Sequence, residues 1–255
     1  MKTRSLLLII FLAGLSVFIL LRSTMCEFHC RSGAEFFDCL TPEFTFICLK
    51  TNRERHEHVK KLIKQHTLCA TIFSALDGTK ISYAKYVDQG YITLKATQQM
   101  REGAIGCGIS HIKVWENFIS SGKAHLTIFE DDVWFNPDFN RHYANFMQHV
   151  PADFDLCQLL HHPQKWARES KLKFGRKIDE YICEGYPQPG LVGYVISQKG
   201  ARKLIGMVTP MVKPIDNMIT DHIRSKTLIS YCPVERFIKM PYKYKSNIWT
   251  TNSRK

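Results

Sequence analysis

A strand-forming apolar run that ends in three consecutive acids constrains this chain more than any other stretch. Residues 126–129 read Leu-Thr-Ile-Phe, and Glu130, Asp131 and Asp132 follow them directly. Burying an unpaired carboxylate is very costly, so the strand is expected to stop here with the acids at its exposed carboxyl end. In open α/β sheets that edge is where ligands bind.

The three acids are compatible with a metal site and also with an acidic turn that caps the next helix. Side chains alternate along extended backbone, so Glu130 and Asp132 are expected on one side and Asp131 on the other. Oxygen ligands of this kind suit Mg²⁺ or Mn²⁺. Taken alone, the acids leave both interpretations open.

The charge balance indicates an anionic partner. The chain has 255 residues with a formal net charge of +12, although its hydrophobic content of 45% is that of an ordinary globular protein. The basic residues are spread along the sequence without a Lys/Arg block or an aromatic RNA-binding motif, which disfavours nucleic acid. A nucleotide diphosphate would account for part of the excess, and solvated surface for the rest.

The N-terminus reads as a membrane anchor. Residues 1–4 carry Lys2 and Arg4, and residues 5–21 form an uncharged apolar run, at the short end of what spans a bilayer. Positive charge before the run predicts a short cytoplasmic tail. The alternative is a signal peptide that is cleaved, leaving a secreted protein, but residues 21–25 offer no clean small-x-small cleavage site.

This interpretation divides the chain into four parts. Residues 1–4 are the tail, residues 5–21 the transmembrane signal anchor, residues 22–42 a stem and residues 43–255 the folded domain. The expected protein is single-pass, with its domain outside the cytoplasm, which in a eukaryote means the lumen of the endoplasmic reticulum or Golgi.

Nine cysteines are present and none forms a C-x-x-C pair, which argues against a zinc ribbon or a thioredoxin-like motif. Cys48 and Cys157 lie in apolar runs and are expected to be small buried hydrophobes. Cys26, Cys30 and Cys39 cluster after the N-terminal segment, where a disulfide is plausible if the region is lumenal.

The hydrophobic pattern predicts an α/β fold. A strand at 44–49, a helix at 53–65 capped by Asn52, and a strand at 71–75 form a βαβ unit, which implies a parallel pair. No element is predicted for residues 79–100. Further strands are expected at 154–160, 190–197 and 234–238, and further helices at 111–121, up to about 149 and up to about 206.

A glycine-rich stretch precedes one of these helices. Gly103, Gly106 and Gly108 are expected in a loop, followed by a helix that Ser110 caps and His111 begins. Glycines let the backbone approach a ligand, and a helix N-terminus favours negative charge, so phosphate or sugar contact is one interpretation. Packing glycines and a structural His111 are the other.

Several of these stretches together resemble glycosyltransferase family 25, which includes lipooligosaccharide β-galactosyltransferases and collagen hydroxylysine galactosyltransferases. The matching pieces are Phe46-Ile-Cys-Leu49 with Glu54-Arg55, Ala75-Leu-Asp77-Gly78, Gly103-Ala-Ile-Gly106-Cys107-Gly-Ile-Ser110-His111, Ile128-Phe-Glu130-Asp131-Asp132, Tyr194-Val-Ile-Ser197 through Gly200-Ala201, and Pro214-Ile-Asp216. At the first strand the family usually has Ile-Asn-Leu followed by Asp-Arg, where this chain has Cys48, Lys50 and Thr51.

The resemblance implies a GT-A fold, with a Rossmann-like mixed sheet flanked by helices, and inverting transfer of galactose from UDP-galactose to a glycan or glycoconjugate. It places Mn²⁺ or Mg²⁺ on Asp132 with Asp131 or Glu130, where the metal would bridge the donor diphosphate. Arg55 is the match to an early arginine that meets phosphate or ribose.

Further site residues follow from the same resemblance. Asp77, Gly106, Ser110 and His111 are expected around the donor. Inversion needs a general base on the acceptor side, and Asp216 is the candidate because it is the later isolated acid within a family motif. Asp221 is the second choice for the base, and a helix cap is the alternative role for Asp216.

Two other functional classes are compatible with parts of this pattern. A non-catalytic carbohydrate-binding or chaperone-like member would keep the fold and lose turnover. A metal-dependent phosphohydrolase would explain the acids but not the remaining motifs. The sequence does not identify the acceptor, and galactose rests on the resemblance alone.

Overall fold

A mixed sheet of seven strands is the centre of the part of the chain that the computed structural model describes, residues 43–160 and 175–240. Its strand order is β2-β1-β3-β7-β5-β8-β6, and a two-stranded pair, β4-β9, lies beside it. The strands are β1 (Phe44–Cys48), β2 (Ala70–Ser74), β3 (His125–Glu130), β4 (Trp134–Phe135), β5 (Leu156–Gln158), β6 (Ile182–Glu184), β7 (Gly193–Ser197), β8 (Ser230–Pro233) and β9 (Ile238–Lys239).

The predicted βαβ unit is confirmed. Helix α2 (Arg53–Gln65) connects β1 to β2, and the two strands are parallel. Asn52 caps the helix, since its side chain accepts a hydrogen bond from the Arg55 amide at 3.2 Å. Strand β3 is also parallel to β1, whereas β7 runs antiparallel to both β3 and β5. The predicted mixed sheet flanked by helices is therefore present.

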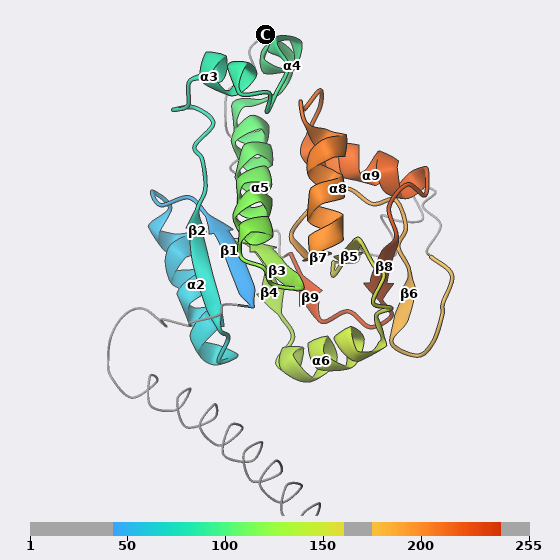
Figure 1. Ribbon diagram of the computed structural model, residues 1–255. Helices are drawn as coiled ribbons and strands as arrows, with labels where there is room; N and C mark the ends of the chain where they lie inside the picture. Colours follow the sequence, from blue (N-terminus) through green and yellow to red (C-terminus); the bar gives the residue numbers. More distant parts are fainter. Residues whose placement is uncertain (1–42, 161–174, 241–255) are drawn as a thin grey trace, which may run out of the picture. The chain divides into compact units, whose positions relative to one another are not determined.

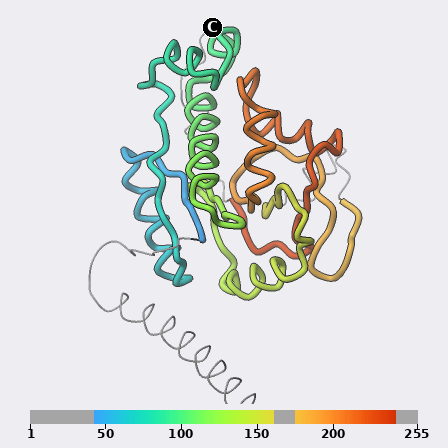
Figure 2. The backbone as a smooth tube through the Cα atoms, in the orientation of Figure 1, coloured from blue at the N-terminus to red at the C-terminus, as the bar shows by residue number. Residues whose placement is uncertain are grey.

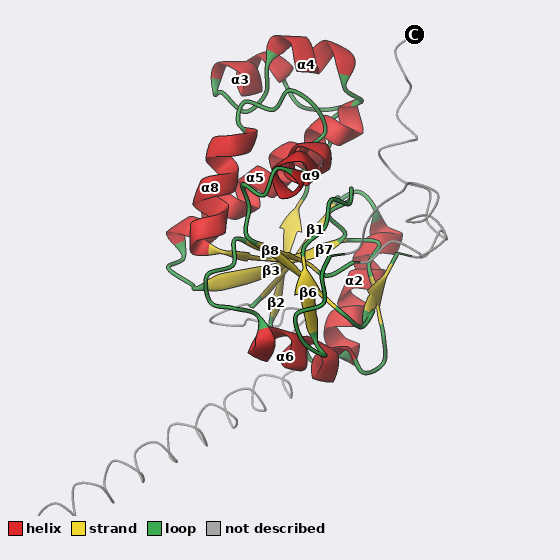
Figure 3. Cartoon of the chain, turned by 90° about the vertical axis from the view of Figure 1, so that its right-hand side faces the viewer, coloured by secondary structure: helices red, strands yellow, loops and turns green. Residues whose placement is uncertain are grey.

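Helices cover both faces of the sheet (Figures 1 and 3). On one face Ile47, Ile128 and Tyr194 pack with residues of α5 (Glu102–Ser120), α8 (Gln198–Val208) and α9 (Ile215–Arg224). On the other, Phe46 and Phe129 pack with α2 and α6 (Phe139–His149). Adjacent residues of one strand enter opposite cores, as the two-residue repeat of extended backbone requires.

Two short helices occupy the stretch for which no element was predicted, α3 (Tyr83–Asp88) and α4 (Leu94–Gln99). Each is six residues long, too short for an apolar period to be visible in the sequence.

The predicted last strand at 234–238 is wrong as well. Strand β8 ends at Pro233, and β9 returns to the centre of the fold to pair with β4 (Figure 2).

The glycine-rich stretch is helical, which corrects the prediction of a loop. Helix α5 begins at Glu102, so Gly103, Gly106 and Gly108 lie inside it, and Ser110 and His111 are mid-helix residues. Close packing is the reason. A Cβ on Gly106 would lie 2.4 Å from the Leu76 carbonyl oxygen, and one on Gly108 would lie 2.5 Å from the Met211 sulfur. Tertiary contacts thus override the low helix propensity of glycine.

The predicted tail, anchor and stem, residues 1–42, lie outside the described residues. Within residues 43–160 and 175–240, no helix has both the length and the apolar character needed to cross a bilayer. Cys69 is disulfide-bonded. Cys48 and Cys157 are buried free thiols, as predicted.

Candidate active site

The predicted site residues that follow β1, β2 and β3 lie at one edge of the sheet. The three strands are parallel, so their carboxyl ends coincide. Arg55 follows β1 in the first turn of α2, and Asp77 follows β2. Glu130 is the last residue of β3, and Asp131 and Asp132 come directly after it. This topology is why Arg55 and Asp131, which are 76 positions apart in the chain, can meet.

Asp131 is an ion-paired, buried acid. Its carboxylate contacts the guanidinium of Arg55, and the two residues are 6% and 5% exposed. Burial raises the pKa of Asp131, while Arg55 and a hydrogen bond with the Cys48 thiol act in the opposite direction. The expected alternation holds for Asp131, which faces α2, and Glu130, which faces α5. The predicted common side for Glu130 and Asp132 is wrong, because the Asp132 carboxylate also lies near Arg55 of α2.

Glu130 is held by two side chains of α5. Its Oε1 lies 3.4 Å from His111 Nε2 and 3.8 Å from the Cys107 sulfur. One ligand atom from each of these three residues lies within 4.8 Å of the others. The group therefore presents one hard and two softer ligands to any ion that enters it.

A buried hydrogen-bond chain fixes the orientation of His111. Trp115 Nε1 donates to the Tyr194 hydroxyl at 2.8 Å, and that hydroxyl lies 2.8 Å from His111 Nδ1. An indole nitrogen can only donate, so the hydroxyl keeps its own proton for Nδ1. In the tautomer that accepts this proton at Nδ1, Nε2 carries the hydrogen of His111 and directs it toward Glu130.

The sequence did not predict these roles for Tyr194 and Trp115. Both are 0% exposed, and a buried tyrosine or tryptophan needs a partner for its polar atom. The available signal was a tyrosine placed mid-strand among apolar neighbours, but the identity of its partner depends on the antiparallel pairing of β3 with β7.

Asp132 is the least compensated of the three acids. It lies past the end of β3, so strand alternation no longer fixes its direction, and its Oδ2 is 3.5 Å from Arg55. Burial, with Glu130 and Asp131 nearby, raises its pKa to about 7 despite Arg55. Its Oδ1 is buried and has no hydrogen-bond partner among the described residues.

Gly106, Ser110 and Asp77 shape the loop that follows β2. Ser110 Oγ accepts from the Leu76 amide at 2.8 Å and donates to the Gly106 carbonyl at 2.6 Å. Asp77 accepts from the Thr79 hydroxyl at 2.6 Å, and hydrogen bonds from Thr79 lower its pKa. The Ser110 contacts hold the loop against α5. Contact of the three residues with the sugar donor stays a prediction.

Asp216 lies in the first turn of α9. Pro214 is the helix cap, so Asp216 is not the cap that the sequence suggested. Its carboxylate accepts from the Gly190 amide at 3.1 Å and the Asn217 amide at 2.9 Å. Its charge also acts on the Cys107 thiol, whose pKa is raised by burial, Glu130 and Asp216. Asp216 is therefore close to the Glu130 cluster.

Asp221 is differently placed, about half exposed on α9. It forms ion pairs with Lys213 and Arg224. Those hydrogen bonds lower its pKa, so Asp221 is a weaker base than a carboxylate with its ordinary pKa.

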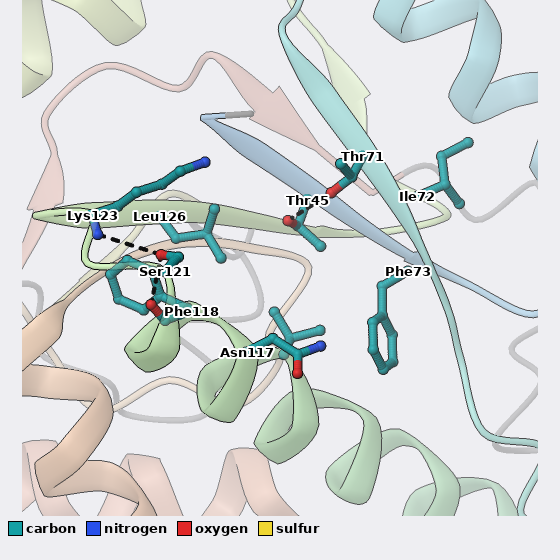
Figure 4. A pocket seen from close by; sticks show the side chains of 10 residues that line it. Thr45, Thr71, Ile72, Phe73, Asn117, Phe118, Ser121, Lys123 and Leu126 are labelled. Atoms are coloured by element: carbon teal, nitrogen blue, oxygen red, sulfur yellow. Dashed lines mark hydrogen bonds between the residues drawn. The ribbon is translucent and has the colours of Figure 1, made fainter. Parts of the chain in front are cut away.

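A hollow of about 280 Å³ lies at the other end of the strands, between α5 and the start of β1 and β2 (Figure 4). Among its described lining residues are Thr45, Thr71, Asn117 and Phe118, and Lys123 is the charged one. Thr45 and Thr71 hydrogen-bond each other at 3.2 Å. The hollow contains none of the predicted site residues.

Residues 42–219 match the profile of glycosyltransferase family 25, described as an LPS biosynthesis protein family. A Drosophila melanogaster "Glycosyltransferase 25 family member" is 27% identical over 80% of this chain and 31% of its own length. A Homo sapiens "Inactive glycosyltransferase 25 family member 3" is 23% identical over 81% and 34%. The chain thus spans about a third of the length of these relatives.

Proposed function

Because the chain belongs to glycosyltransferase family 25, whose members act on a sugar donor and an acceptor, we propose that it is a metal-dependent hexosyltransferase. The proposed donor is UDP-galactose, and the acceptor is a hydroxyl of a glycan or glycoconjugate. Transfer proceeds with inversion and gives a β-linkage. Family membership supports glycosyl transfer in general; the sugar, the metal and the stereochemistry are the proposal.

The observation that carries this proposal is the buried Oδ1 of Asp132. It has no hydrogen-bond partner within the described ranges, and the carboxylates of Glu130 and Asp131 lie nearby. A divalent cation would compensate this site, because it would pair with the unpartnered oxygen and offset the repulsion between the acids. The residues fit such an ion, with Asp132 and Glu130 as the proposed ligands. Asp131 is the third acid of the set, already paired with Arg55.

The bound cation, Mn²⁺ or Mg²⁺, would neutralise charge on the departing nucleotide diphosphate. Asp216 is the proposed general base, which takes the proton from the acceptor hydroxyl. The amides of Gly190 and Asn217 orient its carboxylate. His111 positions Glu130 through its Nε2 proton.

The remaining predicted residues complete the proposed donor site. Arg55 balances Asp131 and Asp132, and it is the proposed contact for a phosphate or the ribose of the donor. Ser110 and Gly106 of α5 contact Leu76 in the loop after β2, next to Asp77, and the three residues are the proposed wall of the donor pocket. In this arrangement they set the shape of the pocket.

Anchoring by residues 5–21 and a domain outside the cytoplasm, with secretion after cleavage as the alternative, belong to the same proposal. The disulfide at Cys69 supports an oxidising compartment. Protease protection of a tagged full chain in microsomes, with carbonate extraction, tests the topology. Full digestion in intact microsomes would contradict it.

The main test measures nucleoside diphosphate released from a panel of UDP-hexoses by the full chain, with Mn²⁺ and with EDTA. The mass of the product formed on each acceptor is read in parallel. We expect release that depends on metal and acceptor. Transfer that persists in EDTA removes the metal role of Asp132.

A second candidate function is a non-catalytic, carbohydrate-binding member. The names of some relatives favour it, since the human relative is called inactive. Tight UDP binding without turnover on any donor or acceptor would establish this alternative.

A further inference from the structure

Cys183 and Cys232 face each other at the outer edge of the sheet, away from the β3 acids in the strand order. Strand β6 is the edge strand and pairs antiparallel with β8, and the register places Cys183 directly opposite Cys232. The two residues are 7% and 0% exposed and form a small cluster with Tyr186. Their sulfur atoms are 3.0 Å apart.

This geometry matches what a disulfide requires of its backbone. Opposed residues of an antiparallel pair have Cα atoms roughly 4.5–5.5 Å apart. Disulfides are found at Cα separations of about 4.4–6.8 Å. Formation of the bond therefore needs only a small movement of the two side chains.

The neighbouring thiol does not compete for either sulfur. Cys157 lies on β5, and its partner in the register with β8 is Tyr231. Directly opposed residues share a face of the sheet, so Cys232, the next residue after Tyr231, points to the other face. The register thus selects Cys183 as the partner of Cys232.

We propose that Cys183 and Cys232 are a disulfide site, oxidised in the mature protein. The oxidant is a disulfide of the compartment in which the chain folds, either glutathione disulfide or a protein oxidoreductase. A Cys183 thiolate attacks that disulfide and releases one thiol, and Cys232 then displaces the second. The chain loses two protons and two electrons, and the oxidant leaves as two thiols.

Two further observations support the assignment. Cys69 is disulfide-bonded, so this chain already contains one such bond. A hydrogen bond with Cys232 lowers the pKa of Cys183, and the same hydrogen bond raises that of Cys232. One thiol of the pair is thereby favoured as the attacking thiolate.

The bond would tie the edge strand to the rest of the sheet. It closes a loop between residues 49 positions apart. Gln188 and Gly190 lie in the segment after β6. The side-chain amide of Gln188 donates to the Leu160 carbonyl, and the backbone amide of Gly190 donates to Asp216. The link would therefore stiffen the segment that supports the Asp216 carboxylate.

Peptide mapping by mass spectrometry tests the proposal directly. The full chain is equilibrated with a mixture of oxidised and reduced glutathione, denatured and alkylated without a reductant, and then digested. We expect a linked peptide containing Cys183 and Cys232. Cys69 is the internal control for a retained disulfide, and Cys157 for an alkylated thiol. Alkylation of both Cys183 and Cys232 in a sample whose Cys69 stays linked overturns the proposal.

Thermal unfolding gives an independent readout. The melting temperature of the wild-type chain and of a Cys183→Ala/Cys232→Ala variant is measured with and without dithiothreitol. We expect the reductant to lower the wild-type value by roughly 5–10 °C more than the variant's. Loss of the Cys69 disulfide is common to both proteins and cancels. Equal shifts in the two proteins would contradict a stabilising link.

Discussion

Asp155, which is fully buried, and Asp132, whose side chain is 13% exposed, lie at opposite ends of two strands that run in the same direction. Asp155 immediately precedes β5, and its side chain is 0% exposed. Lys203 lies 2.8 Å from it, Lys199 3.2 Å, and the Ile229 amide donates to it at 2.9 Å. Asp132 follows β3 with Glu130 and Asp131 beside it and shares Arg55 with Asp131.

Burial acts to raise the pKa of both carboxylates, but their net pKa shifts have opposite signs. Burial acts to raise the pKa of Asp155, but Lys203, Lys199 and the Ile229 amide outweigh it, so the pKa is lowered. The pKa of Asp132 rises to about 7 because acidic neighbours add to burial. An acid surrounded by donors serves the fold, whereas one surrounded by acids destabilises it and points to a binding function.

The largest expected effect is on the activity of Asp132→Asn. The change removes the proposed metal ligand but keeps the shape of the side chain, so turnover should fall by roughly 100-fold or more. Stability should stay the same or rise, since one repelling charge is gone. Release of UDP and the unfolding midpoint measure the two effects. The control is Asp138→Asn, which changes an acid whose side chain is 63% exposed. Equal activity of the two variants would contradict the proposed role of Asp132 as a metal ligand.

Asp155→Asn should show the reverse pattern. Removing the carboxylate leaves Lys203 and Lys199 without their acidic partner and should lower the free energy of unfolding by about 2–4 kcal/mol. Turnover per folded molecule should stay within twofold of wild type. Chemical denaturation and the transfer assay measure these quantities. A variant as stable as wild type would show that the Lys203 and Lys199 pairs contribute nothing net.

A smaller effect is expected on how the stability contribution of Asp155 depends on pH. The pKa of Asp155 is depressed in the folded state, so its contribution is fully present above the unfolded value of 3.8 and is lost as the pH falls below it. The stability difference between wild type and Asp155→Asn should therefore shrink from pH 6 toward pH 3. A difference that is constant over that range contradicts the ion pairing.

The smallest expected effect is that of Tyr194→Phe. The loss of one hydroxyl frees His111 Nδ1 and removes the reason for its proton to stay on Nε2. Turnover should fall about 3- to 10-fold, with little change in the Michaelis constant for donor. Thr127→Val is the control. Thr127 lies on the same strand as Glu130, and its hydroxyl is hydrogen-bonded to that of Tyr143 at 2.5 Å. Equal losses in both variants would indicate general damage to the sheet.

The parts of the fold predicted correctly depend on local signals. The end of the strand at the acids, the Asn52 cap and the βαβ pattern of residues 44–75 are all encoded in continuous stretches of sequence. The start of α5 was not predictable in this way, because its glycines pack closely against Leu76 and Met211, which are distant from them in the sequence or lie in another element. Arg55 with Asp131 and Tyr194 with His111 are 76 and 83 positions apart. Their contacts follow from strand order, which composition does not reveal.

The division of the β3 acids between two helices has a consequence for how this chain can change over generations. Asp131 reaches Arg55 of α2 on one face, and Glu130 reaches His111 of α5 on the other. Deleting or inserting one residue within 126–129 would exchange the faces and separate both acids from their partners at once. Related chains should therefore differ here by substitution, and alignment gaps should fall outside β3.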